Sequence, residues 1–377
     1  MEAIQNFLND YTLQIVSLGS ILLGMISGVL GSFAVLRKQS LLGDAISHAA
    51  LPGIAAAFII TQTKNTEVLL IGALIAGLLA TGLIIVIDKY SRIKFDSALG
   101  LVLSVFFGIG LVMLTYIQKI PNANQAGLDK FIFGQASTLL MRDIQLMIGI
   151  GTVLLILVVV FWKEFKIISF DPDFAQSLGF SVRKITFILS GMIVAAIIIG
   201  LQTVGVILMS AMLVAPGVAA RQWTDKLGKM VVIAAFIGAL SGVSGTLISS
   251  SIEKMPTGPS IVIVVSLFVL FSLAFAPNRG LVWKMIRDRK NRMELNEDKI
   301  LMNLYSLAMN HDDRTHGHHI TMIKPTKNRR GQATEQLKTA MRHLEAKGWA
   351  RSDYFETWAI TDEGIQYVES HPMKGGL

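Results

Sequence analysis

Long apolar runs fill the first three quarters of the chain. Eight segments contain no Asp, Glu, Lys or Arg, and each is close to or above the length of one membrane crossing. A helix needs about 20 apolar residues to cross the hydrocarbon layer of a bilayer. We therefore predict a membrane span in every run. The runs are Tyr11–Leu36, Ala45–Thr63, Val68–Ile87, Ser97–Gln118, Ile144–Trp162, Ile185–Ala220, Met230–Ile252 and Met255–Asn278.

One run is too long for a single crossing. Ile185–Ala220 has 36 residues, with Gly200, Gln202 and Gly205 at its centre. Glycine favours turns, so this run predicts two spans joined by a tight turn. The chain then has nine crossings, or eight if one segment is re-entrant. The spans are also rich in small residues at spacings of four, such as Gly72 and Ala76, which predicts close helix packing.

The pattern changes after residue 286. Residues 1–286 carry 32 charged side chains, whereas the 91 residues from 287 to 377 carry 28. A soluble domain with so few charges over 286 residues would lack polar groups for its surface, so that class is excluded. The predicted fold is an all-α polytopic membrane bundle at 1–286, followed by a small α+β domain in water at 287–377.

The charge distribution predicts the orientation of the spans. Loops after odd-numbered spans hold 12 Lys and Arg residues, and loops after even-numbered spans hold 5. By the positive-inside rule, the N-terminus lies outside and the C-terminal domain lies in the cytoplasm. The N-terminal residues before Tyr11 contain no Lys or Arg, so we expect the first run to remain as a span. The net charge of +8 has the same origin and is not by itself an indication of nucleic-acid binding.

One ionisable residue stands inside the second predicted span, and another immediately precedes it. Asp44 and His48 are four residues apart, which places both side chains on one helix face. Charged groups at membrane depth are costly and mark ion pathways in many transporters. A carboxylate and an imidazole can hold a divalent transition ion, and Ser47 can add an oxygen as a weaker ligand. The alternative is that Asp44 lies at the span end and His48 is a hydrogen-bonded core residue. The sequence Pro52-Gly53 predicts a break in this helix that frees backbone carbonyls.

Four motifs resemble one family. The run Leu42-Gly-Asp-Ala-Ile-Ser-His-Ala-Ala-Leu-Pro-Gly53 is similar to the second-helix signature of permease subunits of bacterial manganese, zinc and iron ABC importers, the ABC-3 family. Three further stretches agree in order: Phe95–Gly100, Phe170–Gly179 and Gln202–Pro216. The resemblance covers about residues 10–280. It implies a multi-pass protein of the bacterial plasma membrane that carries a divalent metal. Manganese is favoured, zinc and iron are alternatives, and Asp44 and His48 lie on the metal path.

The chain lacks the Gly-x-x-x-x-Gly-Lys-Ser/Thr form that cradles nucleotide phosphates, so we expect no ATP binding or enzymatic activity. Asp171-Pro-Asp173 predicts a helix start in a cytoplasmic loop, which is either an ATPase-docking segment or a solvated turn. The resemblance implies a coupling helix there, carried by Asp171, Asp173, Ala175, Leu178 and Gly179. It also implies a pair of ABC ATPase subunits, a second permease copy or paralogue, and an extracellular metal-binding lipoprotein. Membrane lipid is the remaining partner.

The last ninety residues predict a separate module. Asn296 predicts a helix cap, with Ile300, Leu301, Leu304 and Ala308 on the buried face of that helix. A second helix over Gly331–Lys347, a hairpin over Trp349–Ile360 and a closing helix over Thr361–Glu369 follow. This order resembles the winged-helix domain of metalloregulators, which most permeases of the family lack.

Two functions are open for this module. The basic run Lys324–Arg330 can contact DNA phosphate, although membrane tethering disfavours DNA, and a solvated charged face fits equally. Four histidines, His311, His316, His318 and His319, can form a regulatory metal site, or belong to a polar loop. The rival to a transport function is a membrane-tethered, metal-responsive transcription regulator.

Overall fold

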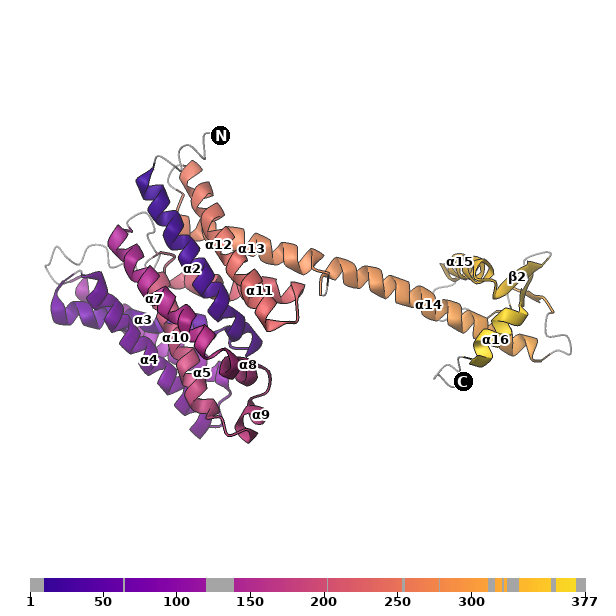
Figure 1. Cartoon of the computed structure of the whole chain (residues 1–377), viewed down its shortest axis with the longest axis horizontal. Coiled ribbons are helices and arrows are strands. Elements are labelled where there is room, and N and C mark those ends of the chain that lie inside the picture. The colour runs from indigo at the N-terminus through magenta and orange to yellow at the C-terminus, as the bar shows by residue number, and fades with distance from the viewer. Residues whose placement is uncertain are drawn as a thin grey trace. The chain divides into compact units, whose positions relative to one another are not determined.

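The computed structural model describes residues 10–63, 65–119, 139–201, 203–252, 255–277, 279–310, 316–320, 322–323, 332–353 and 357–370. The chain divides into two compact units, Met1–Leu281 and Val282–Leu377. The first unit is a bundle of helices (Figure 1). Its described helices are α2 (Tyr11–Leu36), α3 (Leu42–Thr61), α4 (Thr66–Tyr90), α5 (Phe95–Ile117), α7 (Met141–Val160), α8 (Trp162–Phe170), α9 (Pro172–Ser177), α10 (Val182–Leu201), α11 (Val206–Trp223), α12 (Leu227–Ser251) and α13 (Thr257–Phe275).

Eight helices of the described part of the chain are long and apolar enough to cross a membrane. They are α2, α3, α4, α5, α7, α10, α12 and α13. The prediction of a helical multi-pass bundle is therefore confirmed. The 36-residue run does split into two helices, α10 and α11, with Gly205 in the left-handed region at a φ of 88°. Of these two helices, α10 is among the eight candidate spans and α11 is not. Gln202 lies outside the described residues.

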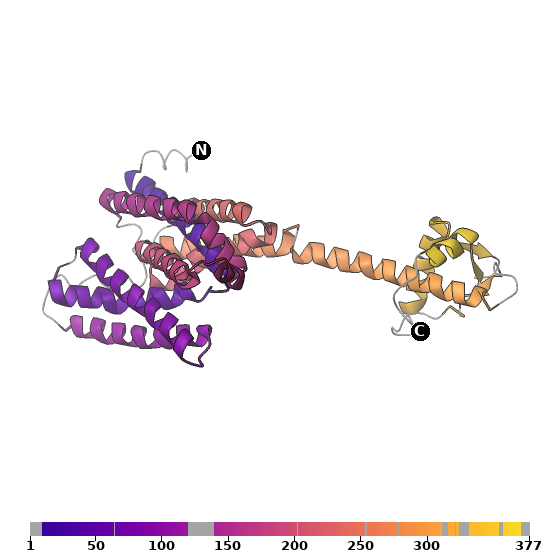
Figure 2. The same cartoon turned by 60° about the horizontal axis from the view of Figure 1, so that its bottom comes forward.

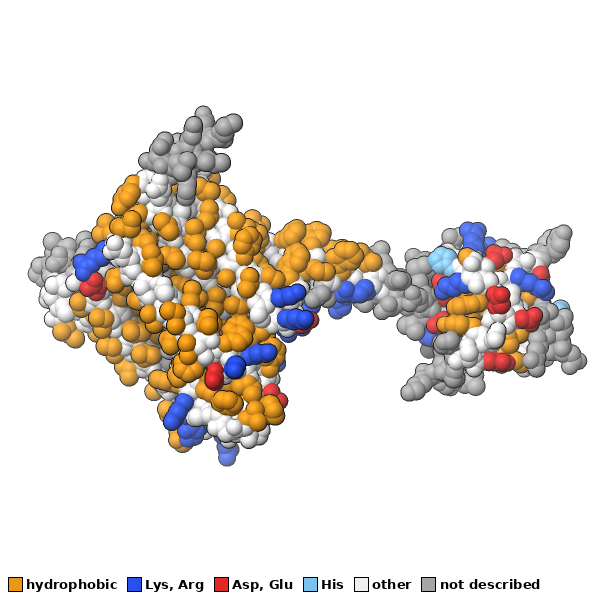
Figure 3. Space-filling model, viewed as in Figure 1, with side chains coloured by type: hydrophobic (Ala, Val, Ile, Leu, Met, Phe, Trp, Pro, Cys, Tyr) orange, Lys and Arg blue, Asp and Glu red, His pale blue; other side chains and the backbone are white. Residues whose placement is uncertain are grey.

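The surface of the bundle is the surface of a membrane protein. Large apolar side chains point outward from several helices, among them Ile75, Val159 and Leu267, which are 55%, 75% and 59% exposed. Water would disfavour so much exposed apolar area, whereas lipid tails do not. Figure 3 shows this apolar surface, with basic side chains of the first unit gathered near the end where α8 and α9 lie.

Small residues bring the helices close together. A methyl group added at Gly24 of α2 would overlap the carbonyl of Gly238 in α12, and one at Gly53 of α3 would overlap the carbonyl of Gly72 in α4. Such small residues let backbones approach where larger side chains would separate them. The helices α3, α4 and α5 pack against one another as a group, visible as the purple helices of Figure 2.

The predicted break at Pro52-Gly53 is wrong. Helix α3 continues through Pro52 to Thr61. Proline removes only its own N–H, so the carbonyl of His48, four residues earlier, loses its helical donor while the rest of the ladder remains. Because Gly53 has no side chain, α3 can approach Gly72 of α4 closely. Gly110 of α5 allows a similar approach to Pro52.

The second unit contains helices and a small sheet. Its elements are α14 (Leu281–Ala308), β1 (His318–His319), α15 (Gln332–Ala346), β2 (Ala350–Asp353), β3 (Thr357–Ile360) and α16 (Asp362–Ser370), with α14 beginning at the last residue of the first unit. The sheet is antiparallel in the order β1-β3-β2, with His318 opposite Trp358 and Ala350 opposite Ile360. The predicted second helix, hairpin and closing helix are present at α15, β2-β3 and α16.

Apolar faces of these elements form one core. Leu301, Leu304, Met341 and Leu344 are fully buried in it, together with Ile323. The predicted helix start at Asn296 is wrong, because α14 passes through that residue without interruption. The stretch before Asn296 holds no Gly or Pro and consists mainly of good helix formers, so nothing there stops the helix.

Candidate metal site on helix α3

Asp44 and His48 lie on adjacent turns at the start of α3. Asp44 is in the first turn, where a carboxylate is favoured by the positive end of the helix dipole. Nε2 of His48 lies 3.5 Å from Oδ1 of Asp44, and the two side chains are 17% and 39% exposed. The predicted pairing on one face is present. Both side chains are therefore partly exposed at the surface of the bundle rather than enclosed in its core.

The His48 ring is held by a neighbour that the sequence did not single out. Its edge packs against the ring of Phe107 in α5, with centroids 4.7 Å apart and planes at 74°. Nδ1 of His48 is buried and has no hydrogen-bond partner in the described part of the chain. Nε2 of His48 is thus the ring nitrogen that faces the Asp44 carboxylate and could share an ion with it. Neutral imidazole is a common ligand for transition metals.

Ser47 lies on a different side of the same turn. It is fully buried, and its hydroxyl donates to the carbonyl of Gly43 at 2.7 Å. That bond uses its proton but leaves oxygen lone pairs. Within the described residues, no group of three or more His, Asp or Glu side chains is placed to hold one ion. Asp44 and His48 therefore offer two side-chain donors, and an ion held there would need further ligands from water, backbone or another chain.

Packing fixes the position of this turn. The backbone of Gly43 lies against Ser210 and Leu213 of α11, and Gly110 brings α5 against Leu51 and Pro52. Pro52 has no backbone N–H to donate to the carbonyl of His48, so the imidazole and this carbonyl come from the same residue. A carboxylate, an imidazole and a carbonyl are all acceptable donors for manganese or iron, and the first two also for zinc.

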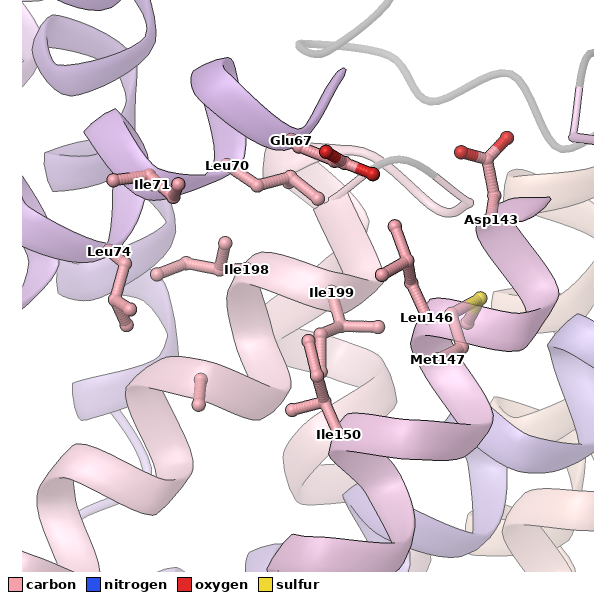
Figure 4. Close-up of a pocket in the computed structure, with 11 residues that line it drawn as sticks. Glu67, Leu70, Ile71, Leu74, Asp143, Leu146, Met147, Ile150, Ile198 and Ile199 are labelled. Atoms are coloured by element: carbon pink, nitrogen blue, oxygen red, sulfur yellow. The ribbon is translucent and has the colours of Figure 1, made fainter. Parts of the chain in front are cut away.

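A separate cavity lies between α4, α7 and α10 (Figure 4). Its volume is 330 Å³, and its lining is apolar apart from Glu67 and Asp143 at one end. Glu67 pairs with Arg142, and Oδ2 of Asp143 accepts from the backbone N–H of Leu140 at 2.9 Å. These two carboxylates are thus engaged in an ion pair and a helix cap, and neither Asp44 nor His48 lines the cavity.

The predicted coupling segment forms a short helix. Asp171 caps α9, with Oδ1 accepting from the N–H of Phe174 at 2.9 Å, and Pro172 stands in the first turn. Ala175 is fully buried against its surroundings, whereas Leu178 is 55% exposed. Gly179 ends the segment with a φ of 85°, a left-handed conformation that glycine adopts without strain. Asp173 lies in the first turn.

Apolar side chains surround this segment on its outer side. Phe170, Phe174 and Leu178 are all more than half exposed. Arg37, at the end of α2, donates from Nη2 to Oγ1 of Thr186 at 3.0 Å, which ties α2 to the start of α10 near the same loop. The segment thus presents an apolar surface close to a point where α2 and α10 are joined by a hydrogen bond.

The histidines of the second unit are only partly described. His311 lies outside the described residues, as does the basic run Lys324–Arg330. The rings of His316 and His318 are 5.7 Å apart between centroids. His318 is buried in β1, and His319 beside it is exposed. A methyl group at Gly317 would lie 2.9 Å from Oδ2 of Asp353, so a carboxylate lies at the same corner.

Comparison with known proteins decides the family. Residues 9–276 match the ABC 3 transport family. The chain belongs to that family. The match covers α2 to α13, including the turn that carries Asp44 and His48.

Relatives of this ABC 3 transport family member differ in how much of the chain they cover. The zinc transport system membrane protein TroC of Treponema pallidum is 49% identical over 290 residues, 77% of this chain and 97% of its own. The manganese transport system membrane protein MntC of Bacillus subtilis is 46% identical over 348 residues, 92% of this chain and 79% of its own. Because the first unit ends at Leu281, the MntC match extends into the second unit.

A solved structure supports the bundle architecture. The PsaBC structure from Streptococcus pneumoniae, in complex with a Fab, superposes with a TM-score of 0.66 at 32% sequence identity. It covers 74% of this chain and 96% of that chain. The likeness therefore corresponds in extent to the membrane unit rather than to the whole polypeptide.

Proposed function

We propose that this chain is the permease subunit of an ATP-driven importer of a divalent transition metal, with manganese as the favoured cargo. The Asp44–His48 pair carries the proposal, because it places a carboxylate and an imidazole 3.5 Å apart at the start of an apolar span. Family membership supports it, and so do the names of the relatives, of which MntC is a manganese transport protein and TroC a zinc transport protein.

The proposed role of the pair is to replace water around the ion during passage. Asp44 neutralises part of the ion's charge, and His48 supplies a nitrogen that manganese, zinc and iron all accept. Ser47 is the weaker candidate ligand, since its hydroxyl proton is bonded to Gly43. A site with only two protein side chains holds an ion loosely, which suits a path that must release its cargo. The sequence lacks the Gly-rich motif that cradles nucleotide phosphates, so the proposed source of energy is a partner subunit.

We assign the proposed partners to the two ends of the helical bundle. The segment with Asp171, Asp173, Ala175, Leu178 and Gly179 couples the permease to a pair of ATPase subunits. The exposed apolar side chains of Phe174 and Leu178 support such docking, because they need a partner in water. With this end in the cytoplasm, the N-terminus is outside, where an extracellular metal-binding lipoprotein delivers the ion. A second permease copy or paralogue completes the path.

Uptake by membrane vesicles tests the cargo and the site together. Asp44→Asn should abolish uptake, because an amide oxygen lacks the charge that holds the ion. Asp88→Asn is the matched control, since Asp88 is an exposed carboxylate at the end of α4 and should tolerate the change. Manganese should be taken up with zinc and iron as weaker competitors. Stronger competition by zinc or iron would reassign the cargo, and full uptake by Asp44→Asn would refute the site.

For the second unit we propose a winged-helix module that senses cytoplasmic metal. The element order and the β1-β3-β2 sheet support the winged-helix assignment, since a helix, a strand, a further helix, a hairpin and a closing helix follow one another. The proposed regulatory ligands are His311, His316, His318 and His319. DNA binding is the disfavoured alternative.

Two changes test the module. Replacing His316 and His319 with Ala should make uptake independent of internal metal, while unchanged dependence would contradict the sensor. Removing residues 290–377 should leave uptake intact, since the candidate path lies in the first unit. Loss of all uptake on that deletion, together with normal uptake by Asp44→Asn, would favour the membrane-tethered regulator instead.

A further inference from the structure

The beginning of α14 carries an exposed apolar surface next to the last membrane span. Helix α13 ends at Phe275 and α14 begins at Leu281. Every large apolar residue in its first two turns is exposed. They are Leu281, Val282, Trp283, Met285 and Ile286, at 60%, 38%, 47%, 58% and 50%.

These residues share one side of the helix. At 100° per residue, the five apolar positions fall within an arc of about 200°. Lys284 and Arg287, three residues apart, stand on the remaining arc. A wide apolar arc beside a basic one is the pattern of helices that lie in the plane of a membrane interface.

The connector holds this helix start at the end of the bundle. Only Ala276–Gly280 separates it from the span, and the N–H of Gly280 donates to the carbonyl of Ala276 at 2.7 Å, which folds the connector into a turn. Nη2 of Arg279 lies 2.7 Å from Oδ1 of Asp225, in the loop between α11 and α12. Even fully extended, five residues reach no more than about 18 Å. The first turn of α14 therefore stays within reach of the lipid headgroups.

The charge of the segment selects the lipid. Between Lys284 and Arg292 the sequence holds five basic residues and one acidic residue. Basic residues close to a membrane end are attracted to anionic lipids, and the attraction falls off within a Debye length of about 8 Å at physiological salt. Zwitterionic lipid offers no such attraction.

We propose that the first two turns of α14 bind an anionic phospholipid surface. The apolar arc enters the boundary between headgroups and acyl chains, and Lys284 and Arg287 contact the anionic headgroups. This surface is distinct from the Asp44–His48 pair, and it holds the second unit at the membrane whether or not the chain transports metal.

The absence of cysteine makes the proposal directly testable in the full-length protein. Met285→Cys on the apolar arc and Arg287→Cys on the basic arc are each labelled with an environment-sensitive fluorophore in lipid nanodiscs. One set of discs contains phosphatidylglycerol and the other phosphatidylcholine alone. Iodide quenches labels in water, and a doxyl-labelled lipid quenches labels in the bilayer.

With phosphatidylglycerol, we expect the label at Met285→Cys to be quenched by the doxyl lipid and protected from iodide, and the label at Arg287→Cys to show the reverse. Replacing both Lys284 and Arg287 with Gln in the Met285→Cys protein should reduce the docked-to-undocked ratio about 25-fold, fivefold for each cation. Phosphatidylcholine alone should also release the helix.

Two results would overturn the proposal. Equal iodide quenching at both positions in phosphatidylglycerol would place the helix in water. Protection at Met285→Cys that is independent of lipid charge and accompanied by cross-linking between copies would assign the apolar arc to a second copy of the chain. Val282→Cys, on the same arc, provides a second reporter if the label at position 285 disturbs the helix.

Discussion

A buried carboxylate should govern the stability of the second unit. The Glu297 side chain on α14 is 5% exposed, and it pairs with Nδ1 of His343 at 3.0 Å and with Nζ of Lys347 at 2.8 Å. His343 stands on α15 and Lys347 is the first residue after that helix, so Glu297 joins α14 to the C-terminal end of α15. We expect Glu297→Gln to loosen this junction without altering the apolar core.

The size of the effect follows from the exposure of the three groups. Breaking a fully buried ion pair costs about 3–5 kcal/mol, mostly because a charge is left unpaired in the core. Here the groups left behind, His343 and Lys347, are 50% and 43% exposed and regain water. We therefore expect a loss of about 2 kcal/mol, which for a unit of this size lowers the melting temperature by roughly 8–16 °C.

Thermal proteolysis of the full-length protein measures this change. The temperature at which cleavage appears within the second unit should fall for Glu297→Gln and stay unchanged for Glu345→Gln. Glu345 is the matched control because it is exposed on α15 and has no ion pair in the described part of the chain. Equal midpoints for the two variants would show that the buried carboxylate contributes nothing beyond a surface charge, and would refute this reasoning.

Two further outcomes are expected from the bundle. Gly238→Ala should lower the melting temperature of the purified protein by forcing α2 and α12 apart, at a cost of about 1–3 kcal/mol, whereas Gly149→Ala, which meets open space, should not; equal melting would contradict the close contact. Leu178→Asp should reduce co-purification of the ATPase subunit while preserving the fold, and Tyr90→Asp, at an exposed position at the end of α4, should leave that association intact. Retained association with Leu178→Asp would argue against docking at α9.

Local patterns were sufficient for the spans. Each crossing needs a continuous apolar run, so charge-free segments predicted helices whose ends differ from the observed ones by a few residues. The split of the long run followed from Gly205, whose backbone adopts the left-handed conformation that glycine favours. The pairing of Asp44 with His48 was also predictable, because a spacing of four residues fixes the face of a helix.

Contacts between distant segments were not predictable in this way. Phe107 lies in an ordinary apolar run, and only the packing of α5 against α3 brings its ring to His48. Glu297 lies in a charged stretch that suggests solvent, yet its carboxylate is buried by α15. The predicted break at Pro52 failed for a related reason, since the close contact between Gly53 and Gly72 favours a continuous helix.

The proposed transport of manganese through Asp44 and His48 is tested most directly by reconstitution. The permease with its ATPase subunits is placed in proteoliposomes, and manganese uptake is measured alongside ATP hydrolysis. For a protein with both Asp44→Asn and His48→Ala, we expect hydrolysis to continue and uptake to fall by about 100-fold or more, since even indirect damage to a metal site costs 10–100-fold. Uptake at the wild-type rate would contradict the proposal that the ion passes these two residues.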